Sequence, residues 1–188
     1  MNTYIALLKG INVGGNKIIK MQALKAMFES LGYDRVRTYI QSGNVVFESG
    51  ETGSALLADT IRAKIIETFG FDASVLIRTL EELEAVIAGN PFELFEEEEY
   101  KRLYVSFLEK EPSAQALEQL RPYADGADKL RVVGREMYTL YEVSVSKSPL
   151  FKVPLEKLLG TSITARNWNT VNKLAALGRS EQETAART

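Results

Sequence analysis

The 188-residue chain contains no cysteine and no histidine. Without cysteine it has no disulfide bonds, zinc ribbons, thiol nucleophiles or iron–sulfur clusters. Without histidine it lacks the usual acid or base at neutral pH and the commonest transition-metal ligand. Catalysis would therefore depend on Asp, Glu, Lys, Tyr or a hydroxyl group, and any metal would be a hard, oxygen-bound cation. The sequence predicts no cofactor and no metal site.

The chain also has little net charge: 23 Lys and Arg against 25 Asp and Glu give −2. This is not the composition of a globally basic nucleic-acid-binding protein, but the acids are uneven, with one run at Glu96–Glu99, so a local basic patch is compatible with it. No apolar stretch approaches the ~20 residues of a membrane helix. Lys9 and Asn12 interrupt any signal-peptide core. We expect a cytoplasmic protein without a membrane partner.

Hydrophobic spacing and turn residues divide the chain into two halves with one element order. The first half is predicted to contain strands at 3–8, 36–40, 45–48 and 73–78 and helices at 21–31, 54–69 and 79–87. The second half is predicted to contain strands at 102–108, 129–133, 136–141 and 162–165 and helices at 113–123, 153–159 and 171–177. This predicts an α+β fold of two ferredoxin-like βαββαβ halves, with mostly antiparallel sheets and an extra C-terminal helix.

The segment 89–100 (GNPFELFEEEEY) is the natural boundary between the halves, because it combines a proline, turn residues and a charge run. The predicted organisation is a first half at 1–88, a linker at 89–100, and a second half with its extra helix at 101–178. Thr170 is predicted to cap the extra helix and Gly178 to end it. The polar tail at 179–188 is expected to be disordered.

Topology brings two polar segments of the first half together. In a βαββαβ unit, the loop after the first strand and the turn after the second lie at the same end of the sheet. The helix that begins near Met21 also directs its N-terminus to this end, which favours anions. The sequence therefore predicts an anion or phosphate site, unless the glycines only shape a surface loop and the lysines are solvated. The candidate residues are Lys9, Asn12, Gly14, Gly15, Lys17, Gln41, Ser42 and Asn44.

A second polar cluster lies where the last strand meets the last helix. Its candidate ligand-binding residues are Arg166, Asn167 and Lys173, which surround the single tryptophan, Trp168. An arginine beside an asparagine and a tryptophan can bind phosphate with two hydrogen bonds and stack on a base. The alternative is a helix cap followed by a tryptophan anchored in the core.

Three segments in this order and spacing resemble the bacterial family catalogued as domain of unknown function 1697: ALLKGINVGGNKIIKM, TYIQSGNVVFES and TARNWNTVNKLAAL. The resemblance covers residues 1 to about 178 and implies the paired ferredoxin-like architecture. It implies no activity. Ala165 departs from the family pattern, in which a hydroxyl residue is common at this position.

The leading hypothesis is a binding module for a phosphate-bearing ligand, either a nucleotide or the backbone of a nucleic acid. One alternative is a structural or protein-interaction module without a small ligand, for which a homodimer is one arrangement. Another is an enzyme that acts on a small phosphorylated substrate without histidine or cysteine. The sequence leaves open whether the chain is an enzyme.

Overall fold

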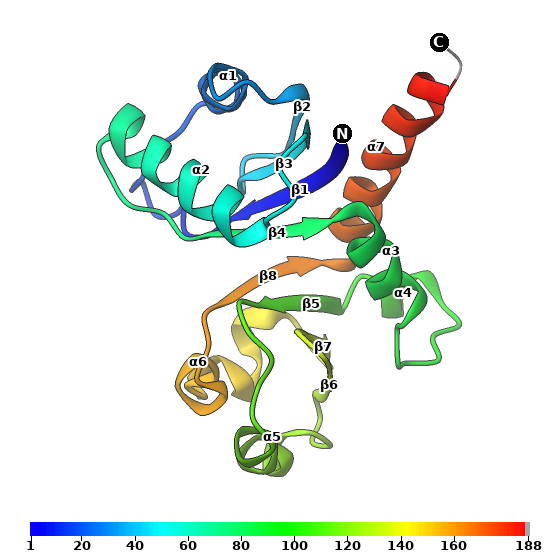
Figure 1. The fold of residues 1–188 in the computed structure, drawn as a ribbon. Helices are drawn as coiled ribbons and strands as arrows, with labels where there is room; N and C mark the ends of the chain where they lie inside the picture. The colour runs from blue at the N-terminus through cyan, green and yellow to red at the C-terminus, as the bar shows by residue number, and fades with distance from the viewer. Residues whose placement is uncertain (187–188) are drawn as a thin grey trace. The chain divides into compact units, whose positions relative to one another are not determined.

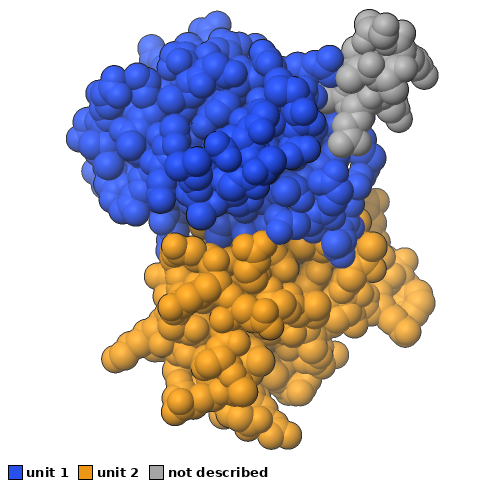
Figure 2. Space-filling view, in the orientation of Figure 1, with its two compact units in different colours: residues 1–85, 173–188 blue, residues 86–172 orange. Residues whose placement is uncertain are grey.

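A computed structural model describes the backbone of residues 1–186 and the side chains of residues 1–180. The chain forms two compact units (Figure 2). Unit 1 comprises residues 1–85 and 173–188, and unit 2 comprises residues 86–172. The C-terminal residues therefore group with the first half, whereas the sequence assigned residues 101–178 to the second.

Unit 1 contains one four-stranded sheet with the strand order β2-β3-β1-β4. Every neighbouring pair is antiparallel, so β1 and β2, which both run against β3, are parallel to each other. The helices α1 and α2 cover the same face of this sheet (Figure 1). The elements are β1 (Asn2–Leu8), α1 (Met21–Ser30), β2 (Asp34–Tyr39), β3 (Asn44–Ser49), α2 (Ser54–Phe69), β4 (Val75–Thr79) and α3 (Leu80–Ala88).

The central strand β1 is apolar on both faces. Tyr4, Ala6 and Leu8 belong to the core that the helices cover. Ile5 and Leu7 point to the opposite face, and they are also fully buried. The sequence of a strand that is buried on both faces is a continuous apolar run, whereas a strand with one solvent-exposed face alternates apolar and polar residues. The TYIALL run is therefore a central strand.

Unit 2 repeats this architecture with the strand order β6-β7-β5-β8, again entirely antiparallel. The helices α5 and α6 lie on one face of the sheet (Figure 1). The predicted α+β class with two antiparallel-sheet halves is confirmed. The elements are α4 (Glu97–Tyr100), β5 (Leu103–Leu108), α5 (Ala114–Leu120), η1 (Arg121–Tyr123), β6 (Lys129–Val133), β7 (Glu136–Leu140), η2 (Val145–Lys147), η3 (Pro149–Lys152), α6 (Leu155–Leu159) and β8 (Ile163–Asn167), where η marks a 3-10 helix.

The C-terminal helix α7 (Trp168–Ala186) is longer than predicted at both ends. Its cap is Asn167, whose Oδ1 accepts the N–H of Thr170 at 2.8 Å, so the prediction that Thr170 caps the helix is wrong. Gly178 lies inside the helix and does not end it. The glycine allows close packing there, because an added Cβ would lie 2.8 Å from Cδ1 of Leu80. The predicted disordered tail overlaps α7 as far as Ala186, and residues 187–188 lie outside the described residues.

The acidic run of the linker forms the short helix α4. The Glu99 carboxylate accepts the N–H groups of Phe95 and Glu96 at 2.9 and 3.0 Å, and these bonds lower the pKa of Glu99. Glu98 pairs with Lys101 at 2.6 Å. Within the described residues, no cluster of acidic side chains could hold a metal ion, and no helix is both long and apolar enough to cross a membrane.

Candidate functional site

Residues 9–20 and 40–44 form one surface of unit 1, which we call the loop surface. Two hydrogen bonds hold the 40–44 segment, one from Asn12 of the first segment and one from Leu8, which directly precedes that segment. The Asn12 side chain donates to the Gln41 carbonyl at 2.8 Å, and the Leu8 N–H donates to the Gly43 carbonyl at 2.8 Å. The structure thus brings together the two segments that topology predicts to be neighbours.

Asn12 holds the loop surface together. Its Nδ2 donates to the carbonyls of Ile19 and Gln41 at 3.0 and 2.8 Å, and its Oδ1 accepts the Ile19 N–H at 2.8 Å. Its backbone lies in the left-handed region, with φ +54°. Since both amide protons are used internally, Asn12 is an anchor of the loop.

We expect Asn12→Ala to lower the free energy of unfolding by about 2 kcal/mol, because it removes three partly exposed hydrogen bonds. Urea denaturation followed by far-UV circular dichroism measures the change. The matched control is Asn16→Ala. The Asn16 amide makes one long contact, of 3.5 Å to the Gly14 carbonyl, so its loss should cost less than about 0.5 kcal/mol. Equal losses in the two variants would contradict the anchoring role of Asn12.

The two candidate glycines form the tip of the loop. Val13 and Asn16 form an isolated antiparallel bridge around Gly14 and Gly15, whose φ angles are +59° and +74°. Positive φ at both central residues is typical of a tight type I′ turn, where glycine is favoured. The tip presents Val13 to solvent with 65% of its surface exposed.

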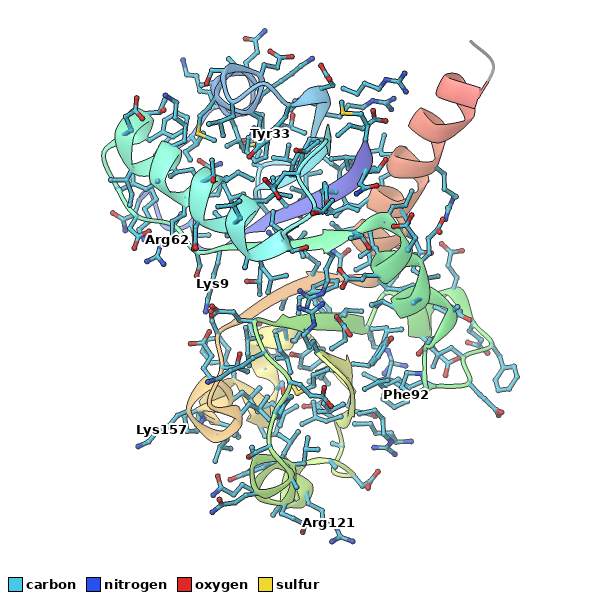
Figure 3. The ribbon with its side chains drawn as sticks, viewed as in Figure 1. Lys9, Tyr33, Arg62, Phe92, Arg121 and Lys157 are labelled. Carbon is cyan, nitrogen blue, oxygen red and sulfur yellow. The ribbon has the colours of Figure 1, made fainter. Side chains whose placement is uncertain are left out.

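Lys17 is held by a residue distant in the sequence. Its Nζ donates to the main-chain carbonyl of Asp72 at 2.7 Å. The Asp72 carboxylate accepts two hydrogen bonds from Arg62, at 2.7 and 2.5 Å, and the pKa of Asp72 is lowered mainly by this contact, with the Lys17 charge adding to it. Arg62 is labelled in Figure 3. Because Lys17 binds a carbonyl rather than a carboxylate, its positive charge is not cancelled by a direct ion pair.

The candidate residues of the 41–44 turn mainly stabilise the turn itself. Asn44 is fully buried, and its Nδ2 donates to the Tyr39 carbonyl and to the Ser42 hydroxyl, each at 2.9 Å. Gln41 contributes its main-chain carbonyl to the bond with Asn12. These side chains give the loop surface its shape, and its charge comes from the lysines.

The N-terminus of α1 opens at the loop surface. Lys20 is the exposed N-cap residue, no side chain caps the helix, and its first turn contains no acid. Neither the segment 9–28 nor the segment 35–47 contains an acidic residue. The first N–H groups of a helix lack partners within the helix and carry a partial positive charge. The lysines and the helix end thus give the surface a local positive potential.

In the second predicted cluster, much of the polar chemistry is structural. Asn167 caps α7, and Trp168 is buried, as the structural alternative requires. Arg166 donates to its neighbouring carbonyl of Ala165 at 2.9 Å, and burial lowers the pKa of Arg166 to about 10, so it stays charged at neutral pH. Lys173 is exposed on α7 and groups with unit 1, whereas Arg166 and Asn167 belong to unit 2.

Unit 2 contains a cavity of about 590 Å³, widely open to solvent, that the sequence patterns did not reveal. It lies between the helix-covered face of the sheet and the segment 145–157, and its lining is mainly apolar. Part of its wall is formed by the 3-10 helices η2 and η3. These helices are too short to show a hydrophobic periodicity, so the sequence does not predict them.

A model of the family described as "Protein of unknown function (DUF1697)" matches residues 1–138. The solved structure of the conserved bacterial protein SP0830 from Streptococcus pneumoniae is similar to this chain, with 23% sequence identity and a TM-score of 0.68. The similarity covers 94% of this chain and 98% of that one, and at this identity it shows the fold alone. No curated protein matches the chain.

Proposed function

Since this chain belongs to the DUF1697 family, whose description assigns no function, we propose from the chemistry of the loop surface that unit 1 binds a phosphate-bearing ligand, namely the backbone of a nucleic acid. The observation that carries the proposal is the uncapped N-terminus of α1 beside Lys17 and Lys20, on segments without any acidic residue. Helix N-termini and lysines together are favourable surroundings for phosphate groups.

The shape of the loop surface favours a polymer over a small nucleotide. Lys17, Lys20 and the glycine tip are exposed on the surface. Several phosphates of an extended backbone can contact such a surface at once, and each contact adds to the affinity. The chain as a whole carries −2, so binding depends on this local charge and not on a general attraction.

Backbone strain supports a functional role for the same surface. Ile40 adopts φ +48° although it is β-branched, and Lys17 also has φ +48°. A β-branched side chain in this region is rare, and such conformations cost of the order of 1–3 kcal/mol and tend to persist where function requires them. Ile40 is also 49% exposed, so burial of its side chain does not explain the conformation.

We expect the double variant Lys17→Ala/Lys20→Ala to bind a fluorescein-labelled single-stranded oligonucleotide roughly tenfold more weakly than the parent at low salt. Fluorescence anisotropy measures the affinity over a series of salt concentrations. Loss of two phosphate contacts should also reduce the slope of log K against log salt by about 1.4, because each contact to a single strand contributes about 0.7.

The control is Lys129→Ala/Lys152→Ala, which removes the same charge from exposed positions of unit 2. It should bind as the parent does. The proposal fails if the parent does not bind, or if the two double variants lose affinity equally. Binding of free nucleotides with the same Lys17 and Lys20 dependence, but without binding of oligonucleotides, would assign the surface to a small phosphorylated ligand instead.

A second candidate function is protein interaction, because the loop surface also exposes aliphatic side chains. Val13 and Ile18 of its first segment are 65% and 61% exposed, and Ile40 of its second segment is 49% exposed. Neighbouring exposed apolar side chains are typical of contact surfaces, and a second copy of the chain is one such partner. Ile18→Glu would then dissociate a dimer in analytical ultracentrifugation at every salt concentration, whereas phosphate binding would weaken as salt rises.

A further inference from the structure

The cavity of unit 2 has a floor of small side chains. Ser106 in the central strand β5 pairs with Ala165 of β8, and both line the cavity. Their neighbours in register, Leu108 and Ile163, are large. Two small residues side by side on β5 and the edge strand β8 leave space above them, and Ala165 is correspondingly exposed although it lies on the helix-covered face. The space therefore follows from the sequence of the two strands.

Apolar side chains form the walls. Leu150 and Val153 come from the segment that covers the sheet, Leu155 comes from α6, and Ile163 comes from β8. A volume of about 590 Å³ is within the range of roughly 300–1,000 Å³ that is usual for small-molecule sites. Most of the binding free energy of such a site comes from the burial of apolar ligand surface.

The hydroxyl of Ser106 is a polar group that faces this apolar space. Ser106 is only 7% exposed, and its side chain has no hydrogen-bond partner among the described residues. Buried polar groups in folded proteins are almost always hydrogen-bonded to protein, water or ligand. Every fully buried side-chain nitrogen or oxygen among the described residues has a partner, so the Ser106 oxygen is one that solvent reaches through the cavity. A ligand in the cavity would take the place of that water, since the hydroxyl can both donate and accept.

Tyr141 supplies a second hydroxyl group at the cavity. Burial, together with the charge of Asp128, raises the pKa of Tyr141, so its hydroxyl stays protonated and can donate. Its ring is held by an edge-to-face contact with Tyr104, with ring centroids 5.3 Å apart. The two hydroxyls give an apolar cavity a small number of groups that can orient a ligand.

The charges around the cavity favour an uncharged ligand. The negative charge of the buried Asp128 acts on Tyr141, and it would repel a phosphate or carboxylate. The charged residues of the lining, Glu156 and Lys157, are both exposed and of opposite sign. Lys157 extends away from the fold in Figure 3. A phosphate-bearing ligand of the kind proposed for unit 1 does not suit this site.

We propose that unit 2 binds a small, mainly apolar, uncharged molecule in this cavity, with its one polar group hydrogen-bonded to the Ser106 hydroxyl. The site is independent of the function proposed for unit 1, because its residues belong to unit 2 alone. The ligand class is an aromatic or branched aliphatic molecule with a hydroxyl or carbonyl group.

Two neutral probes test the proposal on the full chain. Nile red, which is apolar and carries a carbonyl group, fluoresces strongly when it leaves water, and naphthol is a competitor with a hydroxyl group. We expect Nile red to bind saturably and naphthol to displace it. Ala165→Phe should abolish binding by filling the cavity, whereas Ala176→Phe, at an exposed position of α7, should not.

The hydrogen bond has its own test. Ser106→Ala should raise the dissociation constant of Nile red by about three- to tenfold, as expected for loss of one hydrogen bond. The exposed Ser146→Ala is the control. In a methyl-labelled sample, naphthol should shift the NMR signals of Ile163 and Leu155. The proposal is overturned if neither probe binds, if Ala165→Phe binds like the parent while remaining folded, or if those methyl signals do not move.

Discussion

Gly43→Ala is expected to lower the free energy of unfolding by about 3 kcal/mol. Two costs add. Gly43 has φ +87°, which an alanine adopts only with strain, and an added Cβ would lie 2.7 Å from the Leu8 Cβ and 2.9 Å from the Ile11 Cδ1. The strain contributes roughly 1 kcal/mol, and the overpacking of a rigid core contributes roughly 2 kcal/mol more.

Gly70→Ala separates these two costs. Gly70 ends α2 with φ +78°, close to the φ of Gly43, but an added Cβ would meet nothing within 4 Å. It should therefore lose only about 1 kcal/mol, which is the strain alone. Urea denaturation followed by far-UV circular dichroism measures both variants. If Gly43→Ala costs no more than Gly70→Ala, the contact of the turn with Leu8 and Ile11 is not tight.

The same turn shows which parts of the fold the sequence can predict. Glycine and asparagine at positions 43 and 44 are local turn residues, and the turn predicted after the second strand joins the antiparallel strands β2 and β3. The capping box of α3 is equally local: Glu82 accepts the Thr79 N–H at 2.9 Å, and the Thr79 hydroxyl accepts the Glu82 N–H at 3.1 Å. Features that depend on a few adjacent residues can be predicted from a sequence, because they involve no residue that is distant in the chain.

The candidate site was predictable only in part. Topology alone brings the loop and the turn together, but it does not reveal how each side chain is used. Lys17 binds Asp72, which is 55 positions away, and Asn12 binds Gln41, which is 29 positions away. Such contacts depend on the packed fold. They give several of the predicted ligand-binding residues a structural role within the loop surface, and the charges of Lys17 and Lys20 and the end of α1 remain its open chemistry.

Packing between elements explains the remaining differences. Glycine at position 178 has the sequence appearance of a helix end, and only the neighbouring Leu80 shows that it serves close packing instead. The cavity of unit 2 results from small residues on two strands, Ser106 and Ala165, which are paired in space but far apart in the chain. Neither feature has a local signature in the sequence.

The second large effect is expected at Asp128, the buried carboxylate of unit 2. It is only 4% exposed, its Oδ1 accepts the Glu142 N–H at 2.7 Å, and its Oδ2 accepts the Ser148 hydroxyl. Asp128→Ala would leave the buried Ser148 hydroxyl and the half-buried Glu142 N–H without their partner. Since each such group costs roughly 1–3 kcal/mol, we expect a loss of about 3 kcal/mol in the free energy of unfolding.

Trp168 is the reporter for this measurement, because it is the single tryptophan and belongs to unit 2. Urea denaturation followed by its fluorescence gives the loss directly. The control is Asp125→Ala. Asp125 pairs with Arg131 at 2.8 Å, but its side chain is 73% exposed, so the pair should contribute less than about 1 kcal/mol. Equal losses in the two variants would show that the buried bonds of Asp128 are not the source of its effect.

Asp128 also connects the stability of unit 2 to its cavity. The Ser148 hydroxyl accepts the Leu150 N–H at 3.0 Å and donates to Asp128. Asp128, which directly precedes β6, therefore holds the start of η3 in place through Ser148. Leu150 lines the cavity. Asp128→Asn, which keeps the size of the side chain but exchanges an acceptor oxygen for a donor, should therefore weaken Nile red binding even where the protein remains folded. If binding is unchanged in the folded variant, the wall formed by η3 is held by its apolar packing, and the Asp128–Ser148 bond contributes to folding alone.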